Sequence, residues 1–167
     1  MESNAVLRDP VRHNVWATDV LIGFCRDQQL TAEQLAATGV GTYGTILATL
    51  DHIVRCDGSY LRRIADSPLD FVDSPESTDF VELRRWNAEA GVLWEQLLAK
   101  PIDVDREMIV DNGAHVTRVG IFLAQAINHA NHHREQVCAI LTGLGVEPPD
   151  IQAWEYAWST GALRVRT

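Results

Sequence analysis

Four long stretches of this sequence place apolar residues three and four positions apart, the spacing that gathers them on one face of a helix. The stretches cover about residues 11–28, 45–65, 77–100 and 119–144. Glycine or proline follows the last three, which marks where those helices end. Four amphipathic helices of this length predict an all-α fold, a four-helix bundle, and the interior of such a bundle is a common place for a metal site.

Two shorter elements complete the predicted fold. Residues 106–118 carry Asn112-Gly113 between β-favouring residues, which predicts a small β-hairpin before the last long helix. Residues 151–158 follow that helix and predict a short C-terminal helix. The sequence has no repeats or linkers, and 167 residues are enough for one well-buried core. We therefore expect a single domain over residues 1–167.

Composition narrows the range of functions. The net charge is −9 and the arginines are scattered, which disfavours nucleic acid as a partner because phosphate binding needs clustered Lys and Arg. No apolar run reaches the roughly 18 residues of a membrane helix, and the N-terminus lacks a signal pattern. The three cysteines are widely spaced, without the spacing of a disulfide framework or a zinc knuckle. We expect a cytoplasmic protein with no membrane partner.

A pair of histidines stands on the apolar stripe of the fourth long helix. His129 and His133 are four residues apart, so their rings lie one above the other on the same helical face. Both rings can point at one ion, as in helical metal sites. They could instead be core-edge histidines that are hydrogen-bonded to a carboxylate or a carbonyl. A catalytic divalent ion normally has at least three protein ligands, so a third would come from elsewhere.

Spacing alone does not identify that third ligand. His132 lies roughly 100° around the helix from His133 and is expected to be solvated. His13 and His115 are expected near the surface, at a helix start and after the hairpin turn. His52 lies roughly 160° from the apolar stripe of its own helix, so periodicity favours an exposed position for it. Its small neighbours on that face could instead leave room for a ligand.

Several segments resemble, in order, the DinB-like (damage-inducible, YfiT-related) family. Residues 45–54 read Thr-Ile-Leu-Ala-Thr-Leu-Asp-His-Ile-Val, similar to the family's second helix with its first metal-binding histidine. Residues 129–136 read His-Ala-Asn-His-His-Arg-Glu-Gln, similar to the family's H-x-x-H-H-R-x-Q signature. The opening His-Asn-Val-Trp-Ala of residues 13–17 and the Pro-Pro-Asp-Ile of residues 148–151 are weaker matches. Glu135 departs from the pattern, since a small residue is usual there.

The resemblance implies a metal site formed by His52, His129 and His133 inside a four-helix bundle, and homodimers are common in the family. The metal would be zinc or nickel, with iron or manganese as alternatives, because neutral imidazoles suit all of these ions. Glu135 would add a charge beside the site without changing the ligand positions.

Other polar residues near the predicted site have open roles. Gln136 follows His133 by three residues and is the candidate catalytic residue, able to hydrogen-bond a water or substrate at the metal; it could equally be a polar residue at the bundle edge. Asp51 and Asp57 could accept an imidazole N–H from a ligand, although acids at such helical positions are more often on the surface. Cys56, four residues after His52, is expected to be a free core cysteine.

Such a site suits two kinds of chemistry. Related families include transferases that use low-molecular-weight thiols, so the leading hypothesis is a divalent-metal-dependent, thiol-dependent S-transferase with a detoxification or stress role. It would act on a small-molecule substrate, with Gln136 assisting. A metallohydrolase on the same site is the alternative, because a metal ion can also activate water. A non-catalytic metal- or ligand-binding bundle protein is a third possibility.

Overall fold

The computed structural model describes residues 4–166 and consists of α-helices with one small β-hairpin. In chain order the elements are α1 (Ala5–Asp27), α2 (Ala32–Leu35), α3 (Ile46–Ala65), the 3₁₀ turn η1 (Asp70–Asp73), α4 (Phe80–Leu98), β1 (Glu107–Val110), the 3₁₀ turn η2 (Asp111–Gly113), β2 (His115–Arg118), α5 (Val119–Gly143) and α6 (Ala153–Ser159). The predicted mostly helical fold, with a hairpin before the last long helix and a short helix after it, is confirmed.

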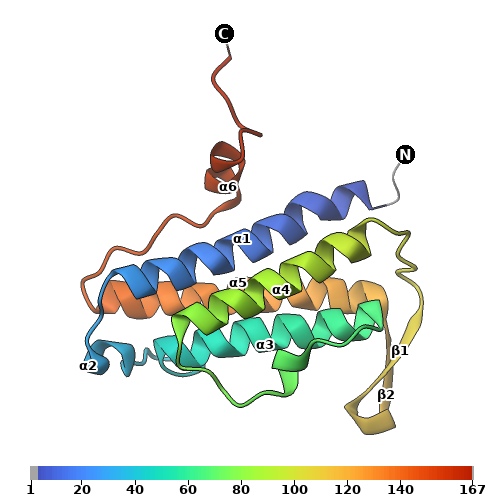
Figure 1. Cartoon of the computed structure of the whole chain (residues 1–167), viewed down its shortest axis with the longest axis horizontal. Helices are drawn as coiled ribbons and strands as arrows, with labels where there is room; N and C mark the ends of the chain where they lie inside the picture. The colour runs from blue at the N-terminus through green and yellow to red at the C-terminus, as the bar shows by residue number, and fades with distance from the viewer. Residues whose placement is uncertain (1–3, 167) are drawn as a thin grey trace.

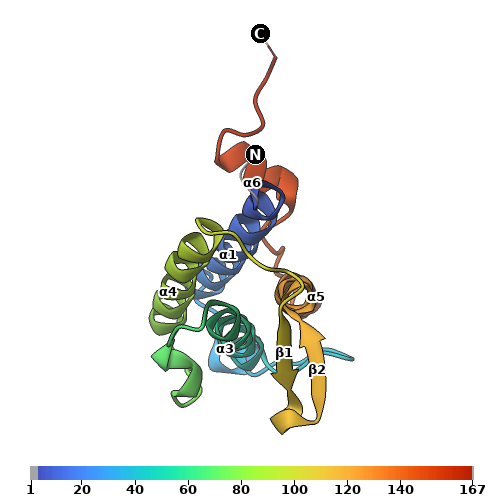
Figure 2. The same cartoon turned by 90° about the vertical axis from the view of Figure 1, so that its right-hand side faces the viewer.

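The four long helices lie side by side (Figure 1). Helix α1 packs against α4 and α5, and α3 packs against the same two, as the end-on view in Figure 2 shows. The apolar side chains enclosed by these contacts include Leu21, Ile22, Leu50, Ile53, Leu61, Leu83, Trp94, Val137 and Leu141. Within residues 4–166, no helix combines the length and the apolar character that crossing a bilayer requires.

Helix α1 begins earlier than predicted. It starts at Ala5 rather than near residue 11, so Pro10 lies inside the helix. Proline has no N–H for the carbonyl four residues before it, here Val6, whose side chain is exposed. Asn4, just before the helix, anchors this end of α1. Its side-chain amide donates to the carbonyls of Leu98 and Lys100 at the end of α4. The first turn of α1 is therefore fixed by a tertiary contact.

The hairpin lies at one end of the long helices and projects from them (Figure 1). Strands β1 and β2 are antiparallel, with Glu107 opposite Arg118 and Val110 opposite His115. The turn is wider than the two-residue turn that Asn-Gly favours, because residues 111–113 form a 3₁₀ turn in which all three residues have positive φ. Arg106 holds the hairpin to α3 by donating to the carbonyl of Ile64 at 2.7 Å.

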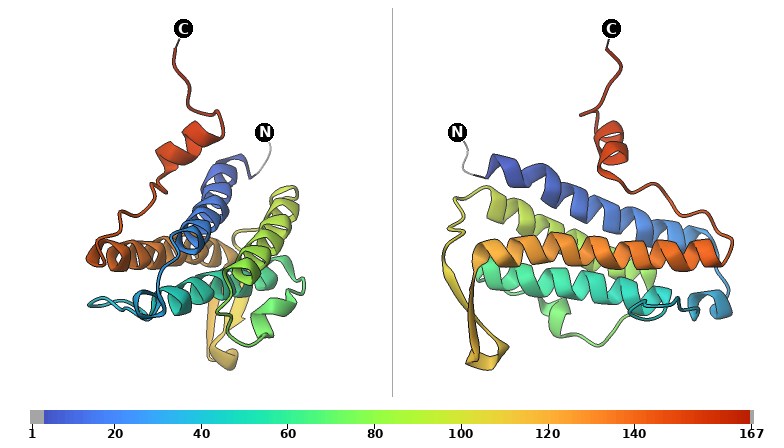
Figure 3. Two further views of the ribbon diagram at one scale, coloured as in Figure 1. Left: turned by 60° about the vertical axis from the view of Figure 1, so that its left-hand side comes forward. Right: turned by 180° about the vertical axis from the view of Figure 1, so that it is seen from behind.

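The C-terminal segment stands apart from the long helices. After α5 the chain runs back along α1, forms α6 and continues away from the other helices (Figure 3). His13 of α1 secures it, with Nε2 2.8 Å from the carbonyl oxygen of Ile151 and its ring against the rings of Trp16 and Tyr156. The ring of His13, expected near the surface, is half-buried and holds the chain that leads into α6.

Candidate metal centre

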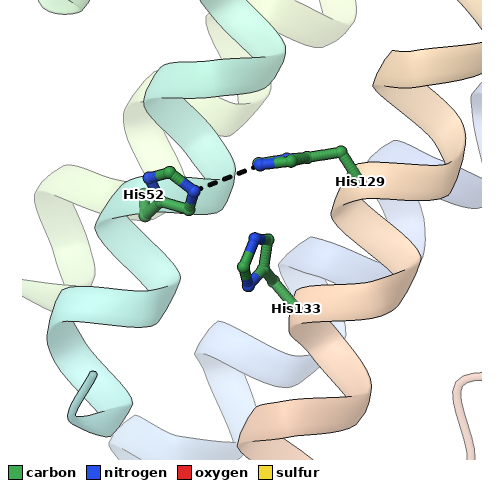
Figure 4. A group of neighbouring side chains, drawn as sticks. All are labelled: His52, His129 and His133. Carbon is green, nitrogen blue, oxygen red and sulfur yellow. Dashed lines mark hydrogen bonds between the residues drawn. The ribbon is translucent and has the colours of Figure 1, made fainter. Parts of the chain in front are cut away.

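His52 of α3 and the pair His129 and His133 of α5 come together where these two helices pack side by side (Figure 4). One nitrogen from each ring lies within 4.8 Å of the others. The Nε2 atoms of His52 and His129 are 3.1 Å apart. Ligands on a tetrahedral zinc ion, about 2.0–2.1 Å from the metal, lie roughly 3.3 Å from one another. The spacing and chemistry of this donor set therefore fit a divalent cation.

His52 occupies the edge of α3 that faces α5, and this explains why periodicity alone misplaced it. The apolar stripe of α3 faces the common core, but α3 also packs along the side of α5. His52 is therefore half-buried, not exposed on a polar face. Its neighbour one turn later, Cys56, has Sγ 3.6 Å from Nδ1 of His52.

The surroundings hold two of these histidines, His52 and His129, in their neutral form. Burial, with a smaller contribution from the nearby rings of His133, His52 and His132, lowers the pKa of His129 to about 4. Burial also lowers the pKa of His52, with a smaller effect from His133. Both rings are consequently neutral at pH 7 and retain a nitrogen lone pair for a cation. Among the described residues, this group of possible metal-binding side chains contains only histidines.

Gln136 connects the cluster to the loop before α3. Its Oε1 accepts from the backbone N–H of Tyr43 at 3.0 Å and lies 2.8 Å from Nδ1 of His133. Its Nε2 donates to the carbonyl of Gly41 at 3.1 Å and lies 3.1 Å from Nε2 of His132. Both ends of the carboxamide thus have protein partners. Its predicted catalytic role stays a prediction.

Aromatic rings flank the histidines. The ring of Tyr43 stacks on that of His52, with centroids 3.8 Å apart and planes 15° apart, and meets His133 edge-on at 5.6 Å. Tyr60 of α3 meets His129 edge-on at 5.8 Å. Because the ring of Tyr43 contacts His52 and His133 on one side and is 54% exposed, it forms a wall between the cluster and solvent.

A buried polar network that the sequence analysis did not predict lies on another face of α5. Nη1 of Arg134 donates to Oδ1 of Asn14 at 2.8 Å and to the hydroxyl of Thr18 at 3.0 Å. Nδ2 of Asn14 donates to the carboxylate of Asp57 at 3.3 Å, and the indole N–H of Trp94 donates to the same carboxylate at 2.9 Å. The network joins all four long helices.

The network contains two buried ionisable groups, and burial is the main cause of the pKa shift of each. Arg134 is 1% exposed and Asp57 is 6% exposed. Desolvation raises the pKa of Asp57 to about 6, opposed by the hydrogen bond from Trp94 and the charge of Arg134. Desolvation also lowers the pKa of Arg134 to about 10. Their opposite charges compensate each other, and Asn14 links the two groups by accepting a hydrogen bond from Arg134 and donating one to Asp57.

Neither acid on α3 supports a ligand histidine. Asp57 belongs to the buried network, and Asp51 is also buried, accepting from the backbone N–H of Ser77 at 2.9 Å with Arg55 at 3.7 Å. The expectations that these were surface acids or imidazole partners are both wrong. A signal for the network was present in the sequence, since Arg134 shares a helical face with the buried residues Ala130, Val137 and Leu141.

The remaining histidines lie outside the cluster. His115 is exposed in β2, with Nδ1 2.9 Å from the carboxylate of Asp111. His132 is exposed on α5, as predicted, beside Gln136.

Comparison with known proteins identifies the family of the chain. No curated protein matches the sequence. A family model described as the DinB family matches residues 1–165, which is essentially the whole chain. The match includes both helices that carry the three clustered histidines, and it agrees with the resemblance of segments 45–54 and 129–136. The chain therefore belongs to the DinB family.

Proposed function

We propose that this protein is a divalent-metal-dependent enzyme in which His52, His129 and His133 bind the cation. The observation that carries the proposal is the convergence of one nitrogen from each of three rings, on two neighbouring helices, within 4.8 Å. Zinc or nickel is the expected metal, with iron or manganese as alternatives. The four long helices would be the bundle predicted from the sequence, forming one domain around this site.

The protein environment supports metal binding over a purely structural role for the histidines. Burial keeps His52 and His129 neutral, so no proton competes with a cation near pH 7. A structural imidazole would be expected to bond to a carboxylate or a carbonyl. Nε2 of His52 and Nε2 of His129 instead face each other at 3.1 Å.

For the reaction, we propose thiol-dependent S-transfer to a small electrophilic substrate, with a detoxification or stress role. A bound divalent cation would lower the pKa of a thiol that coordinates to it. The donor set supports this choice, because the acids nearest in sequence to His52, Asp51 and Asp57, are committed to Ser77, Asn14 and Trp94. Hydrolysis of an ester or amide normally needs a positioned general acid for the leaving group.

In this proposal the protein's own groups orient and shield the reactants. The rings of Tyr43 and Tyr60, which contact His52 and His129, would shield two sides of the cluster from water. Gln136 assists by holding His133. A homodimer is also proposed, and the exposed Trp154 and Trp158 of α6 support contact with another chain.

The test combines metal analysis with an activity screen. The purified protein would be analysed for bound metals beside single His→Ala variants at positions 52, 129 and 133, with His115→Ala as the control. We expect about one metal ion per chain in the wild type and the control, and loss in the three variants. Metal-loaded protein would then be assayed with low-molecular-weight thiols and electrophiles, and separately with esters and amides. Wild type that retains no added divalent metal would overturn the proposal, and ester or amide turnover without thiol transfer would replace the reaction by hydrolysis.

A further inference from the structure

We propose that Gln136 is a positioning residue through which the backbone of residues 41–43 selects the tautomer of His133. The selected tautomer leaves Nε2 of His133 free for the cation, while His132 is held out of the ligand set. The part of this inference that concerns the cation rests on the proposed function. The tautomer itself is a property of the metal-free protein.

The orientation of the Gln136 carboxamide follows from two backbone groups whose roles cannot change. The N–H of Tyr43 can only donate, and it lies 3.0 Å from Oε1. The carbonyl of Gly41 can only accept, and it lies 3.1 Å from Nε2. A rotated amide would place two donors together at Tyr43 and two acceptors together at Gly41. The loop therefore fixes which end of the carboxamide carries oxygen.

The fixed carboxamide then assigns the two imidazoles. Oε1 only accepts, so Nδ1 of His133, 2.8 Å away, is the nitrogen that carries hydrogen. In a neutral ring the other nitrogen, Nε2, then has the lone pair. His133 is 8% exposed, so solvent has little influence on this choice. The same carboxamide donates through Nε2 to Nε2 of His132 at 3.1 Å, which occupies the lone pair of that nitrogen.

This arrangement explains how two adjacent histidines have different roles. His132 and His133 are neighbours in the chain and both rings contact Gln136. One presents a donor to the carboxamide and the other an acceptor, so only His133 keeps a free Nε2. The spacing of the sequence alone does not make this distinction.

The same contacts link the loop to the metal site. Gly41 has φ of 75°, a left-handed conformation that glycine adopts without strain, and this turn brings its carbonyl to Gln136. Two residues later the ring of Tyr43 lies on His52. A cation that binds His133 and His52 would stabilise the position of the loop, and by reciprocity an ordered loop would strengthen cation binding.

Three variants test the inference. Gln136→Met keeps the side-chain length but removes every hydrogen bond. Gln136→Glu restores an acceptor for His133 and Tyr43 but cannot donate to Gly41. Gln96→Met makes the same change at an exposed position of α4 and is the matched control. Thermal unfolding of each variant would establish that it is folded.

The first measurement uses metal-free protein and ¹⁵N NMR of the imidazoles. We expect His133 to carry hydrogen on Nδ1 in the wild type, in Gln136→Glu and in Gln96→Met. In Gln136→Met we expect a shift toward the Nε2–H form and faster exchange of the Tyr43 amide proton. A wild-type His133 protonated on Nε2, or an unchanged Nδ1–H form in Gln136→Met, overturns the inference whatever the metal result.

The second measurement is titration with Co²⁺, followed by its visible absorption. We expect Gln136→Met to bind about 10–100-fold more weakly than wild type, the range typical of a lost partner of a metal-binding histidine. Gln136→Glu should recover most of that loss, whereas Gln96→Met should match wild type. Equal affinity of Gln136→Met and wild type overturns the link to the cation. Absence of Co²⁺ binding in wild type overturns that link together with the proposed function. The NMR measurement on metal-free protein still decides whether Gln136 selects the tautomer of His133.

Discussion

Two faces of helix α5 hold polar side chains in different ways. On one face, His129 and His133 meet His52 with nitrogens turned toward a common point and with aromatic rings on either side. On the other, Arg134 is sealed among side chains from α1 and linked through Asn14 to Asp57. In the histidine cluster, burial keeps His52 and His129 neutral. The Arg134 network instead contains opposite charges and is completely buried. Polar groups on one helix can thus serve either a site or the fold, and the partners they contact decide which.

The largest expected effect comes from breaking the buried network. Arg134→Met would leave the Asp57 carboxylate without its compensating charge, so we expect a loss of about 3–5 kcal/mol in the free energy of unfolding, measured with urea. Arg85→Met is the control, because the ion pairs of Arg85 are on the surface and should contribute less than about 1 kcal/mol. A similar, small change in both variants would show that the network does not stabilise the fold.

Removal of a candidate ligand should weaken metal binding strongly and change the stability of the metal-free protein little. His133→Ala takes away one of three donors, so we expect Co²⁺ affinity to fall by more than about 100-fold, beyond the range for residues that only support a ligand. The free energy of unfolding of the metal-free protein should change much less than in Arg134→Met. Co²⁺ affinity close to that of wild type would contradict the assignment of His133.

Acidification should change the stability contributions of the two faces of α5 in opposite directions. The pKa of His129 is lowered to about 4 from an ordinary 6.5, so the unfolded chain takes up the proton first and the stability from this group is lost as pH falls from about 6.5 to 4. The pKa of Asp57 is raised from 3.8 to about 6, so the folded protein takes up that proton first and the contribution of Asp57 becomes more favourable as pH falls from about 6 to 4.

Urea unfolding of metal-free protein between pH 7 and 4 would measure both slopes. Compared with wild type, Asp57→Asn should lose stability more steeply on acidification, and His129→Gln less steeply. Parallel curves for all three proteins would show that neither group titrates as its surroundings imply.

The smallest expected effect is that of Tyr43, the ring between the histidine cluster and solvent. Tyr43→Ala removes the ring stacked on His52, and an aromatic pair contributes about 0.5–1.5 kcal/mol, so we expect Co²⁺ affinity to fall only about 2- to 10-fold. Val40→Ala, at a fully exposed position of the same loop, provides the control. A loss as large as that of His133→Ala would place Tyr43 among the groups that bind the cation.

Local patterns in the sequence predicted what local geometry controls. The long helices follow from apolar periodicity, and the shared face of His129 and His133 follows from their spacing. The position of His52 depends on which side of α3 meets α5, and a family resemblance, not periodicity, pointed to it. The early start of α1 depends on Asn4 reaching Leu98, a contact between distant parts of the chain.

The long-range contacts of the buried network and of the site could not be predicted from such patterns. Arg134 bonds to Asn14, 120 residues away in the sequence. Gln136 reaches Tyr43 only because the loop before α3 turns back over α5. Each of these pairs depends on how helices and loops meet in three dimensions, so the spacing of one partner, such as Arg134 on the buried face of α5, does not identify the other.

The origin of the three histidines on just two helices has a mechanical consequence. His52 and His129 are 77 residues apart along the chain, so an ion held between them would act as a detachable clasp that joins α3 to α5. Loading would add stability by mass action in proportion to the logarithm of the free metal concentration. The protein's resistance to unfolding would then follow the metal supply of its surroundings, although α1 and α4 contribute no ligand.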